Sequence, residues 1–158
     1  MRPLRVLCVA SGGGHLEQLL ACIDALEGHR ITLGIYEFSN LRNFHHPLIH
    51  HLRSVPFLGF AGPAVYLGLV LGAVKWFWVF LTERPDVVVS TGAEVGIVPL
   101  FLGWLCRRRT IFVETAARLE RPSGTGKIVY PFCSAFFVQS QAMLRHYGPK
   151  ARYVGSLL

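Results

Sequence analysis

The sequence predicts an α/β protein, a Rossmann-like parallel sheet in one domain, and three observations lead to this prediction. Continuous apolar runs alternate with segments of helical periodicity along the 158 residues. The first apolar run leads into three glycines and a helix-like segment, "VASGGGHLEQLL" at residues 9–20. The length suits one domain with a sizeable core. We therefore expect residues 1–158 to form one domain.

The expected strands are short apolar runs, typical of parallel strands that are buried on both faces. They fall at 5–10, 31–36, 86–90, 110–113, 135–139 and 152–154, with a weaker one near 48–54. The expected helices lie between them, at 15–27, 63–82, 94–106, 124–132 and 140–147. This alternation predicts a parallel sheet with right-handed crossovers.

The first turn has the chemistry of an anion site. Ser11, Gly12, Gly13 and Gly14 let the backbone approach a ligand closely, and a helix N-terminus presents unpaired N–H groups to a phosphate. Neither nucleotide fingerprint is complete, here or at "RPSGTGKIV" (residues 121–129). A tight turn without a ligand is the alternative. His15 lies at the mouth of the turn, where a neutral imidazole can act as a general base.

The composition favours anionic partners and a large apolar interface. The net charge is +7, thirteen of the sixteen basic residues are arginine, and 52% of the residues are hydrophobic. Arginine suits phosphates, diphosphates and anionic lipid head groups. Because the basic residues are scattered and no recognition motif accompanies them, we expect no nucleic-acid partner. The four dispersed cysteines predict neither a zinc site nor a disulfide.

The segment "HHPLIHH", residues 45–51, concentrates four histidines. A proline interrupts any helix that would align them, and no carboxylate lies nearby to complete a metal site. We therefore expect a solvated loop there, and neither a metal nor another cofactor. "CRRRT", residues 106–110, reads as surface charge that compensates a helix C-terminus, unless this edge faces lipid.

Residues 55–81 carry a single charge, Lys75, over 27 residues. One crossing of a bilayer would put strands of one sheet on opposite sides, and two crossings need about 40 apolar residues. We therefore expect the segment to dip into one leaflet and return; a buried crossover helix is the alternative. The residues expected at the membrane are Phe57, Phe60, Tyr66, Leu67, Leu71, Lys75, Trp76 and Trp78.

Four further stretches carry a family resemblance: "VVVSTGAEVGIVPLFLG", "TIFVETAARLERPSGTGKIVYPF", "FFVQSQ" and "ARYVGSLL". With the glycine turn, they make the chain resemble the PssD/CpsF-type polysaccharide biosynthesis proteins. It is similar also to the acceptor-side subunit of the dolichol-pathway N-acetylglucosaminyltransferase, and more distantly to the N-terminal half of the MurG-like transferases.

The resemblance implies the N-terminal, acceptor-binding and membrane-docking half of an inverting GT-B glycosyltransferase split into two chains. A separate donor-binding subunit would hold the UDP-sugar, and this chain would receive a polyprenyl-diphosphate-linked saccharide in exopolysaccharide or capsule synthesis. The chain would be inactive alone and would attach peripherally to the cytoplasmic face of the plasma membrane. Neither a metal nor a cofactor is implied.

The resemblance also suggests roles for individual residues. His15 or Glu114 would be the base, although pairing of Glu114 with Arg118 or Arg121 is equally compatible with the sequence. Further residues expected near the acceptor or its phosphates are Thr91, Gly92, Glu94, Thr115, Arg118, Ser123 and Lys127.

Two other functions remain open at this point. A nucleotide-dependent enzyme in its own right would bind a UDP-sugar or a dinucleotide without a partner. A non-catalytic membrane adaptor would tolerate replacement of both His15 and Glu114.

Overall fold

Every expected strand is present in one parallel sheet. The computed structural model describes residues 2–37, 44–56 and 63–157, without the side chains of residues 63–66 and 69. The strands are β1 Arg5–Val9, β2 Arg30–Tyr36, β3 Ile49–Val55, β4 Val87–Ser90, β5 Arg109–Val113, β6 Ala135–Val138 and β7 Ala151–Tyr153. They lie in the order β3-β2-β1-β4-β5-β6-β7, and every neighbouring pair is parallel.

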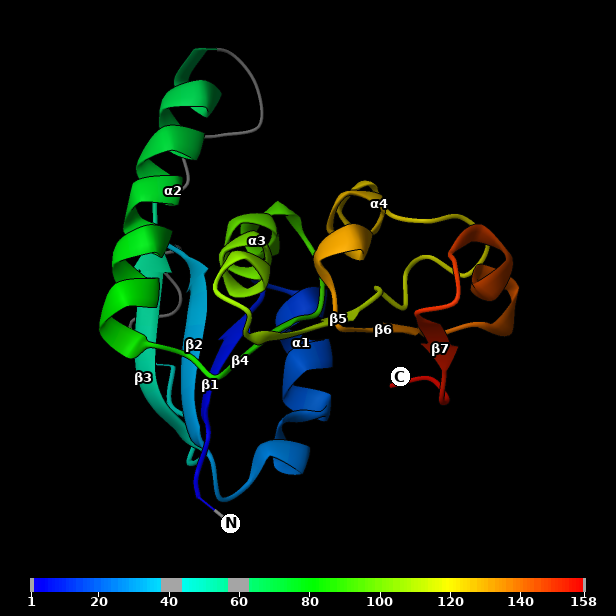
Figure 1. Cartoon of the computed structure of the whole chain (residues 1–158), viewed down its shortest axis with the longest axis horizontal. Helices are drawn as coiled ribbons and strands as arrows, with labels where there is room; N and C mark the ends of the chain where they lie inside the picture. Colours follow the sequence, from blue (N-terminus) through cyan, green and yellow to red (C-terminus); the bar gives the residue numbers. More distant parts are fainter. Residues whose placement is uncertain (1, 38–43, 57–62, 158) are drawn as a thin grey trace.

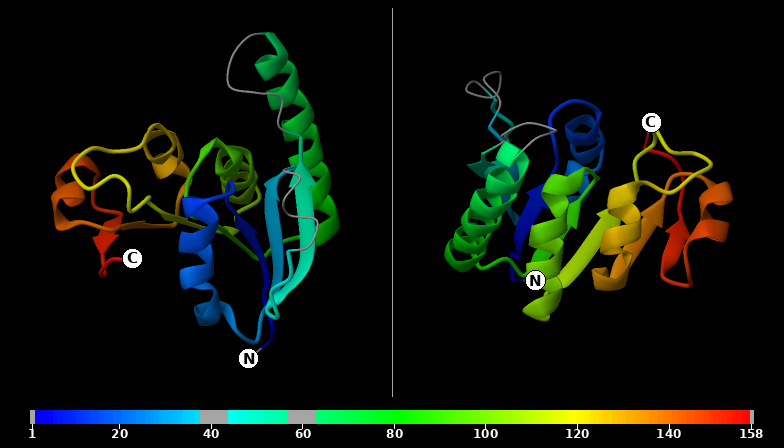
Figure 2. Two further views of the ribbon diagram at one scale, coloured as in Figure 1. Left: turned by 180° about the vertical axis from the view of Figure 1, so that it is seen from behind. Right: turned by 90° about the horizontal axis from the view of Figure 1, so that it is seen from above.

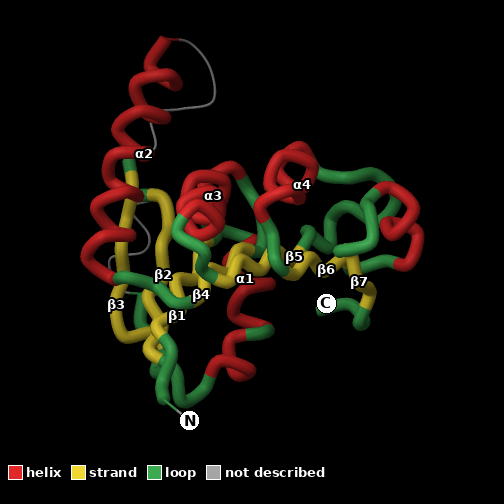
Figure 3. Tube along the Cα trace, viewed as in Figure 1, coloured by secondary structure: helices red, strands yellow, loops and turns green. Residues whose placement is uncertain are grey.

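The helices follow the expected positions, but several are shorter or more tightly wound (Figures 1 and 3). The α-helices are α1 Gly14–Ala21, α2 Pro63–Glu83, α3 Ile97–Leu105 and α4 Gly124–Val129. Short 3₁₀ segments are η1 Ile23–Leu26, η3 Glu94–Gly96, η4 Tyr130–Phe132 and η5 Gln141–His146. The expected helix at 140–147 is therefore a 3₁₀ segment. The expected helix at 124–132 is divided into α4 and the 3₁₀ segment η4, which contains Pro131.

Helices cover both faces of the sheet, which explains the continuous apolar runs of its central strands. Helix α1 packs on one face, whereas α2, α3 and α4 lie on the other (Figure 2). In β1, Leu7 and Val9 belong to the core under α2–α4, and Val6 and Cys8 to the core under α1. Burial on both faces leaves no strand position for a polar stripe.

The prediction that Trp76 anchors the chain at a membrane is wrong, because its side chain is buried. It is 3% exposed and lies with Val79 and Phe80 in the core between α2 and the sheet. Its ring lies so close to β2 that a Cβ added at Gly34 would overlap it. Trp76 therefore fixes α2 on the sheet, and Gly34 makes room for the ring.

The opposite side of α2 remains apolar and exposed. Its large side chains are between 44% and 65% exposed: Leu67, Val70, Leu71, Val74, Phe77, Trp78 and Leu81. The first turns of α2 extend well beyond the sheet (Figure 1). None of the helices in the described parts of the chain combines the length and apolar character that a crossing requires.

The other expected membrane residues divide into two groups. Phe57 and Phe60 lie outside the described residues, as does the side chain of Tyr66. Lys75 lies on α2 and donates to Glu37, with 2.8 Å between Nζ and Oε1. Its charge is therefore paired within the chain, just beyond the end of β2.

Candidate functional site

The candidate site lies at the carboxyl edge of the sheet, where the strand order reverses between β1 and β4. Strand β1 pairs with β2 on one side and with β4 on the other, so the connections leaving β1 and β4 diverge to opposite faces. In open α/β sheets this crevice is where ligands bind. The turn after β1 and the turn after β4 both open onto it.

The glycine turn after β1 begins α1 with its backbone accessible. Gly13 is the N-cap residue, with φ 74°, and its carbonyl accepts from the Glu17 amide at 3.1 Å. Gly13 and Gly14 are exposed, and a Cβ at either would meet nothing within 4 Å. Because the cap is glycine, no side chain satisfies the first-turn amides, which stay available to an anion.

His15, at the start of α1, is held by the turn after β4. Its Nδ1 lies 3.0 Å from the carbonyl oxygen of Thr91, and the Thr91 hydroxyl donates back to the His15 carbonyl at 2.7 Å. A carbonyl only accepts, so Nδ1 carries the proton of this bond. In the neutral ring, Nε2 therefore keeps its lone pair and can accept a proton.

Gly92 supports the His15 ring. A Cβ at Gly92 would lie 2.6 Å from both Cε1 and Nδ1 of His15, and its φ of 123° lies in the region that favours glycine. The sequence predicted a contact between Gly92 and the acceptor. In the structure, the His15 imidazole occupies the space that a side chain at residue 92 would fill, and contact of Gly92 with the acceptor stays a prediction.

Thr91 and Glu94 both make hydrogen bonds within the chain. Thr91 is fully buried, and its hydroxyl donates to the His15 carbonyl. It is therefore a residue that positions His15. Glu94 is exposed and accepts a hydrogen bond from Tyr36 at the end of β2. Burial, reinforced by the neighbouring Glu94 carboxylate, raises the pKa of the Tyr36 phenol.

Glu114 is completely buried, just after β5. Its Oε1 accepts from the Thr115 amide at 3.0 Å, and its Oε2 accepts from the Ser123 amide at 3.2 Å and from the Tyr147 hydroxyl. A Cβ at Gly126 would overlap Oε2. These donors come from the backbone and a tyrosine, so the pairing with Arg118 or Arg121 considered from the sequence is wrong.

The contacts of Glu114 make it a tether. It joins the end of β5 to the start of α4 and to Tyr147, which follows η5. Burial, and then the hydrogen bond to Glu114, raise the pKa of the Tyr147 phenol. With both carboxyl oxygens occupied and no exposed surface, Glu114 is placed to hold the loop between β5 and α4.

That loop and α4 carry the remaining predicted ligands. Thr115 is buried, and its hydroxyl accepts from Gln18 at 3.4 Å and from the Ala117 amide at 3.3 Å. Ser123 caps α4 by accepting from the Gly126 amide at 2.8 Å. Arg118 and Lys127 are exposed, so these two keep cationic groups at the surface.

Sequence reasoning missed two buried glutamines that join this loop to α1. Gln139, just after β6, donates from Nε2 to Gln18 Oε1 at 3.1 Å and to the Glu114 carbonyl at 2.9 Å. Gln18 Oε1 also accepts from the Ala116 amide at 3.3 Å. Gln18 is the polar exception on the buried side of α1, one turn after His15, and that exception was the available signal.

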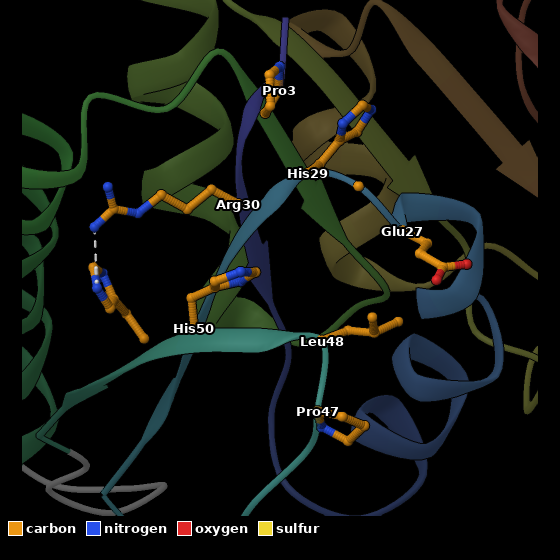
Figure 4. Close-up of a pocket in the computed structure, with 9 residues that line it drawn as sticks. Pro3, Glu27, His29, Arg30, Pro47, Leu48 and His50 are labelled. Carbon is orange, nitrogen blue, oxygen red and sulfur yellow. Dashed lines mark hydrogen bonds between the residues drawn. The ribbon is translucent and has the colours of Figure 1, made fainter. Parts of the chain in front are cut away.

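The histidine segment lies at the amino edge of the sheet, and the loop prediction holds for His45 and His46 but is wrong for its second half. His50 and His51 belong to β3: His50 accepts from the Ile31 amide, and His51 lies 3.2 Å from Arg30 and 3.1 Å from Glu83. They line an open pocket of about 750 Å³ with His29 and Arg30 (Figure 4). Within the described residues, no group of three or more His, Cys, Asp or Glu side chains could hold a metal.

Comparison with protein families gives the deciding observation. Residues 61–157, which contain β4 through β7 and the Glu114 tether, match the family described as "Oligosaccharide biosynthesis protein Alg14 like". The chain belongs to the Alg14 family. The dolichol-pathway side of the predicted resemblance is thus confirmed at family level, and the PssD/CpsF-type assignment stays a prediction.

Relatives named UDP-N-acetylglucosamine transferase subunit ALG14 support the Alg14 assignment. That of Eremothecium gossypii is 27% identical over 182 residues, 99% of this chain and 81% of the relative. That of Schizosaccharomyces pombe is 24% identical and covers 95% of this chain and 81% of the relative. That of Yarrowia lipolytica is 35% identical over a shorter match, 48% of this chain and 38% of the relative.

Solved structures show the same fold at low identity. Acinetobacter baumannii MurG superposes with a TM-score of 0.70 and 13% identity, over 98% of this chain and 44% of MurG. A UDP-N-acetylglucosamine 2-epimerase from Rickettsia bellii gives 0.73 and 14%, over 99% and 46%. This Alg14-family chain thus spans just under half of these proteins. The predicted fold, one Rossmann-like half of a GT-B architecture, is confirmed.

Proposed function

We propose that this Alg14-family chain is the acceptor-binding, membrane-docking subunit of a two-chain inverting glycosyltransferase. The partner subunit holds a UDP-sugar, which the names of the relatives suggest is UDP-N-acetylglucosamine. The acceptor is a polyprenyl-diphosphate-linked saccharide of exopolysaccharide or capsule synthesis. The family match carries this proposal.

The geometry of His15 supports its role as the general base of the transfer. The acceptor hydroxyl attacks the anomeric carbon, the bond from that carbon to the UDP oxygen breaks, and UDP leaves with the electron pair. The hydroxyl proton passes to Nε2 of His15, whose Nδ1–H is held on the Thr91 carbonyl. The first-turn amides of α1 lie beside His15 and are placed to hold the acceptor diphosphate.

Co-expression with a donor-binding partner tests the function. The purified pair is assayed with a polyprenyl-diphosphate-linked saccharide and a panel of UDP-sugars. We expect transfer from UDP-N-acetylglucosamine by the pair and none by this chain alone, because the donor is held by the partner. Micromolar binding of a UDP-sugar to this chain alone, measured by calorimetry, would favour a self-sufficient nucleotide-dependent enzyme.

We place the chain peripherally on the cytoplasmic leaflet of the plasma membrane, and the exposed side of α2 supports docking on a lipid surface. Its seven exposed apolar side chains lie on one helix that extends beyond the sheet. Burying them in lipid contributes about 25 cal/mol per Å² of apolar surface. Trp76 holds the other side of α2 on the sheet, so the exposed side is free to face lipid.

A triple variant of α2 tests this docking. We expect Leu67→Ser, Leu71→Ser and Trp78→Ser together to move the protein from the membrane to the soluble fraction, because all three side chains are exposed. Flotation with liposomes measures the change. Leu119→Ser with Val154→Ser is the matched control, since these residues are as exposed but lie off α2. Equal flotation of the triple variant and the wild type would contradict docking through α2.

A further inference from the structure

A basic pocket of about 400 Å³ opens at the amino edge of the sheet, at the other ends of the strands from His15. Its lining combines four arginines with one acid: Arg2, Arg107, Arg108, Arg109 and Asp86, together with Leu4 and Val87. Strands β4 and β5 both begin here, and α3 ends here. The pocket therefore lies among the ends of these elements and is separate from the proposed acceptor site.

The charge of Asp86, the one acid in the lining, is already paired with Arg5, which does not line the pocket. Arg5 donates to Asp86 three times, from its amide at 3.0 Å and from its guanidinium at 3.2 and 3.1 Å. Arg108 approaches the same carboxylate only at 4.0 Å. Across the described residues, no side-chain hydrogen bond or ion pair joins Arg2, Arg107 or Arg109 to an acid; the Arg109 amide donates to the Asp86 carbonyl at 3.3 Å. The pocket therefore holds an excess of unmatched guanidinium charge.

Arg107 occupies a backbone position that suits glycine. It follows α3 with φ 55°, where its amide donates to the Trp104 carbonyl at 3.0 Å and closes the helix. Glycine adopts this left-handed conformation at helix C-termini without a Cβ penalty. Cations near a helix C-terminus are generally favourable, but that attraction does not require an arginine at this residue. A strained conformation that keeps a side chain in a pocket points to a use for the side chain.

We propose that this pocket binds a phosphate-bearing anion through Arg107 and its neighbouring arginines. The planar guanidinium fork matches the oxygens of a phosphate or diphosphate with paired hydrogen bonds. The same chemistry comes from two sources, a free diphosphate or the head group of an anionic lipid. The site is independent of the acceptor site and of the glycosyltransferase proposal.

Two matched variants test the pocket. Arg107→Gly removes the guanidinium and places glycine where the backbone prefers it, so the melting temperature is expected to hold. Arg84→Gly is the control: Arg84 directly follows α2 and has the same left-handed conformation, with φ 47°, but does not line the pocket. Calorimetry with inorganic pyrophosphate is expected to show about tenfold weaker binding for Arg107→Gly and near-normal binding for Arg84→Gly.

Vesicles distinguish the two sources. Binding to phosphatidylcholine vesicles with and without phosphatidylglycerol is compared, because the difference isolates the head-group contribution from the apolar contact of α2. If pyrophosphate does not bind but Arg107→Gly alone removes that difference, the site is supported and the source is lipid. If both arginine variants weaken binding equally, or neither does so with either probe, only net charge is acting and the pocket proposal is overturned.

Discussion

Replacing His15 by alanine in the assembled complex is expected to lower kcat by about 10²–10⁴-fold, the usual effect of losing a general base. KM for the acceptor is expected to change little, because the first-turn amides of α1 remain in place. Partner binding, measured by co-purification, and flotation with liposomes are expected to be unaffected, since His15 lies away from the exposed side of α2. Steady-state kinetics of the purified pair measure the change.

Gly92→Ala tests the same base without removing the imidazole. The new Cβ would lie 2.6 Å from the His15 ring, in a backbone conformation that favours glycine, so the ring must move off the Thr91 carbonyl. We expect kcat to fall, because the imidazole is displaced from the position in which it can act as the base. Gly124→Ala is the matched control, because a Cβ there meets nothing within 4 Å. Near-normal turnover of the His15→Ala variant would show that His15 is not the general base.

Glu114→Ala is expected to cost about 3 kcal/mol of unfolding free energy, because it leaves buried donors without an acceptor. The amides of Thr115 and Ser123 and the hydroxyl of Tyr147 all donate to this carboxyl group. Urea unfolding measures the loss. Glu120→Ala, an exposed acid on the same loop, is expected to stay within about 0.5 kcal/mol of the wild type.

Glu114→Gln separates a tether from a base. The amide keeps the shape and one acceptor oxygen, so we expect a smaller loss of stability than for alanine and measurable turnover wherever the protein is folded. A variant that keeps the wild-type melting temperature but has no turnover would transfer the base assignment from His15 to Glu114. If His15→Ala and Glu114→Gln both keep turnover, the chain is an adaptor and the chemistry lies in its partner.

The strands could be predicted because the central strands of a parallel sheet are buried on both faces, and such strands appear in the sequence as continuous apolar runs. The meeting of the turns after β1 and β4 also followed from the sequence, since the carboxyl ends of parallel strands share one edge. The contact between His15 and Gly92 did not, because it joins residues 77 positions apart and depends on the φ of Gly92. Gly92 in the sequence indicated a turn, but did not indicate that the turn accommodates the His15 ring.

The wrong prediction for Trp76 has a physical cause: the sequence does not show which side of a largely apolar helix is covered. Helix α2 is apolar all round, so nothing in its pattern separates Trp76, which is buried, from Trp78, which is exposed. Glu114 was hard to interpret because its partners Ser123 and Tyr147 are defined by tertiary contacts alone. Local sequence there suggested arginine, which the fold leaves at the surface.

The contact between Gly34 and Trp76 has a consequence for how this sequence can diverge. A side chain at Gly34 and the indole at Trp76 require the same volume, so neither residue can change freely while the other is kept. Alanine at position 34 is tolerated only after the tryptophan has been replaced by a smaller residue. Loss of the tryptophan first would leave a cavity that a larger residue at position 34 could then fill. The two positions are therefore expected to covary among descendants of this chain, although they lie 42 positions apart in the sequence.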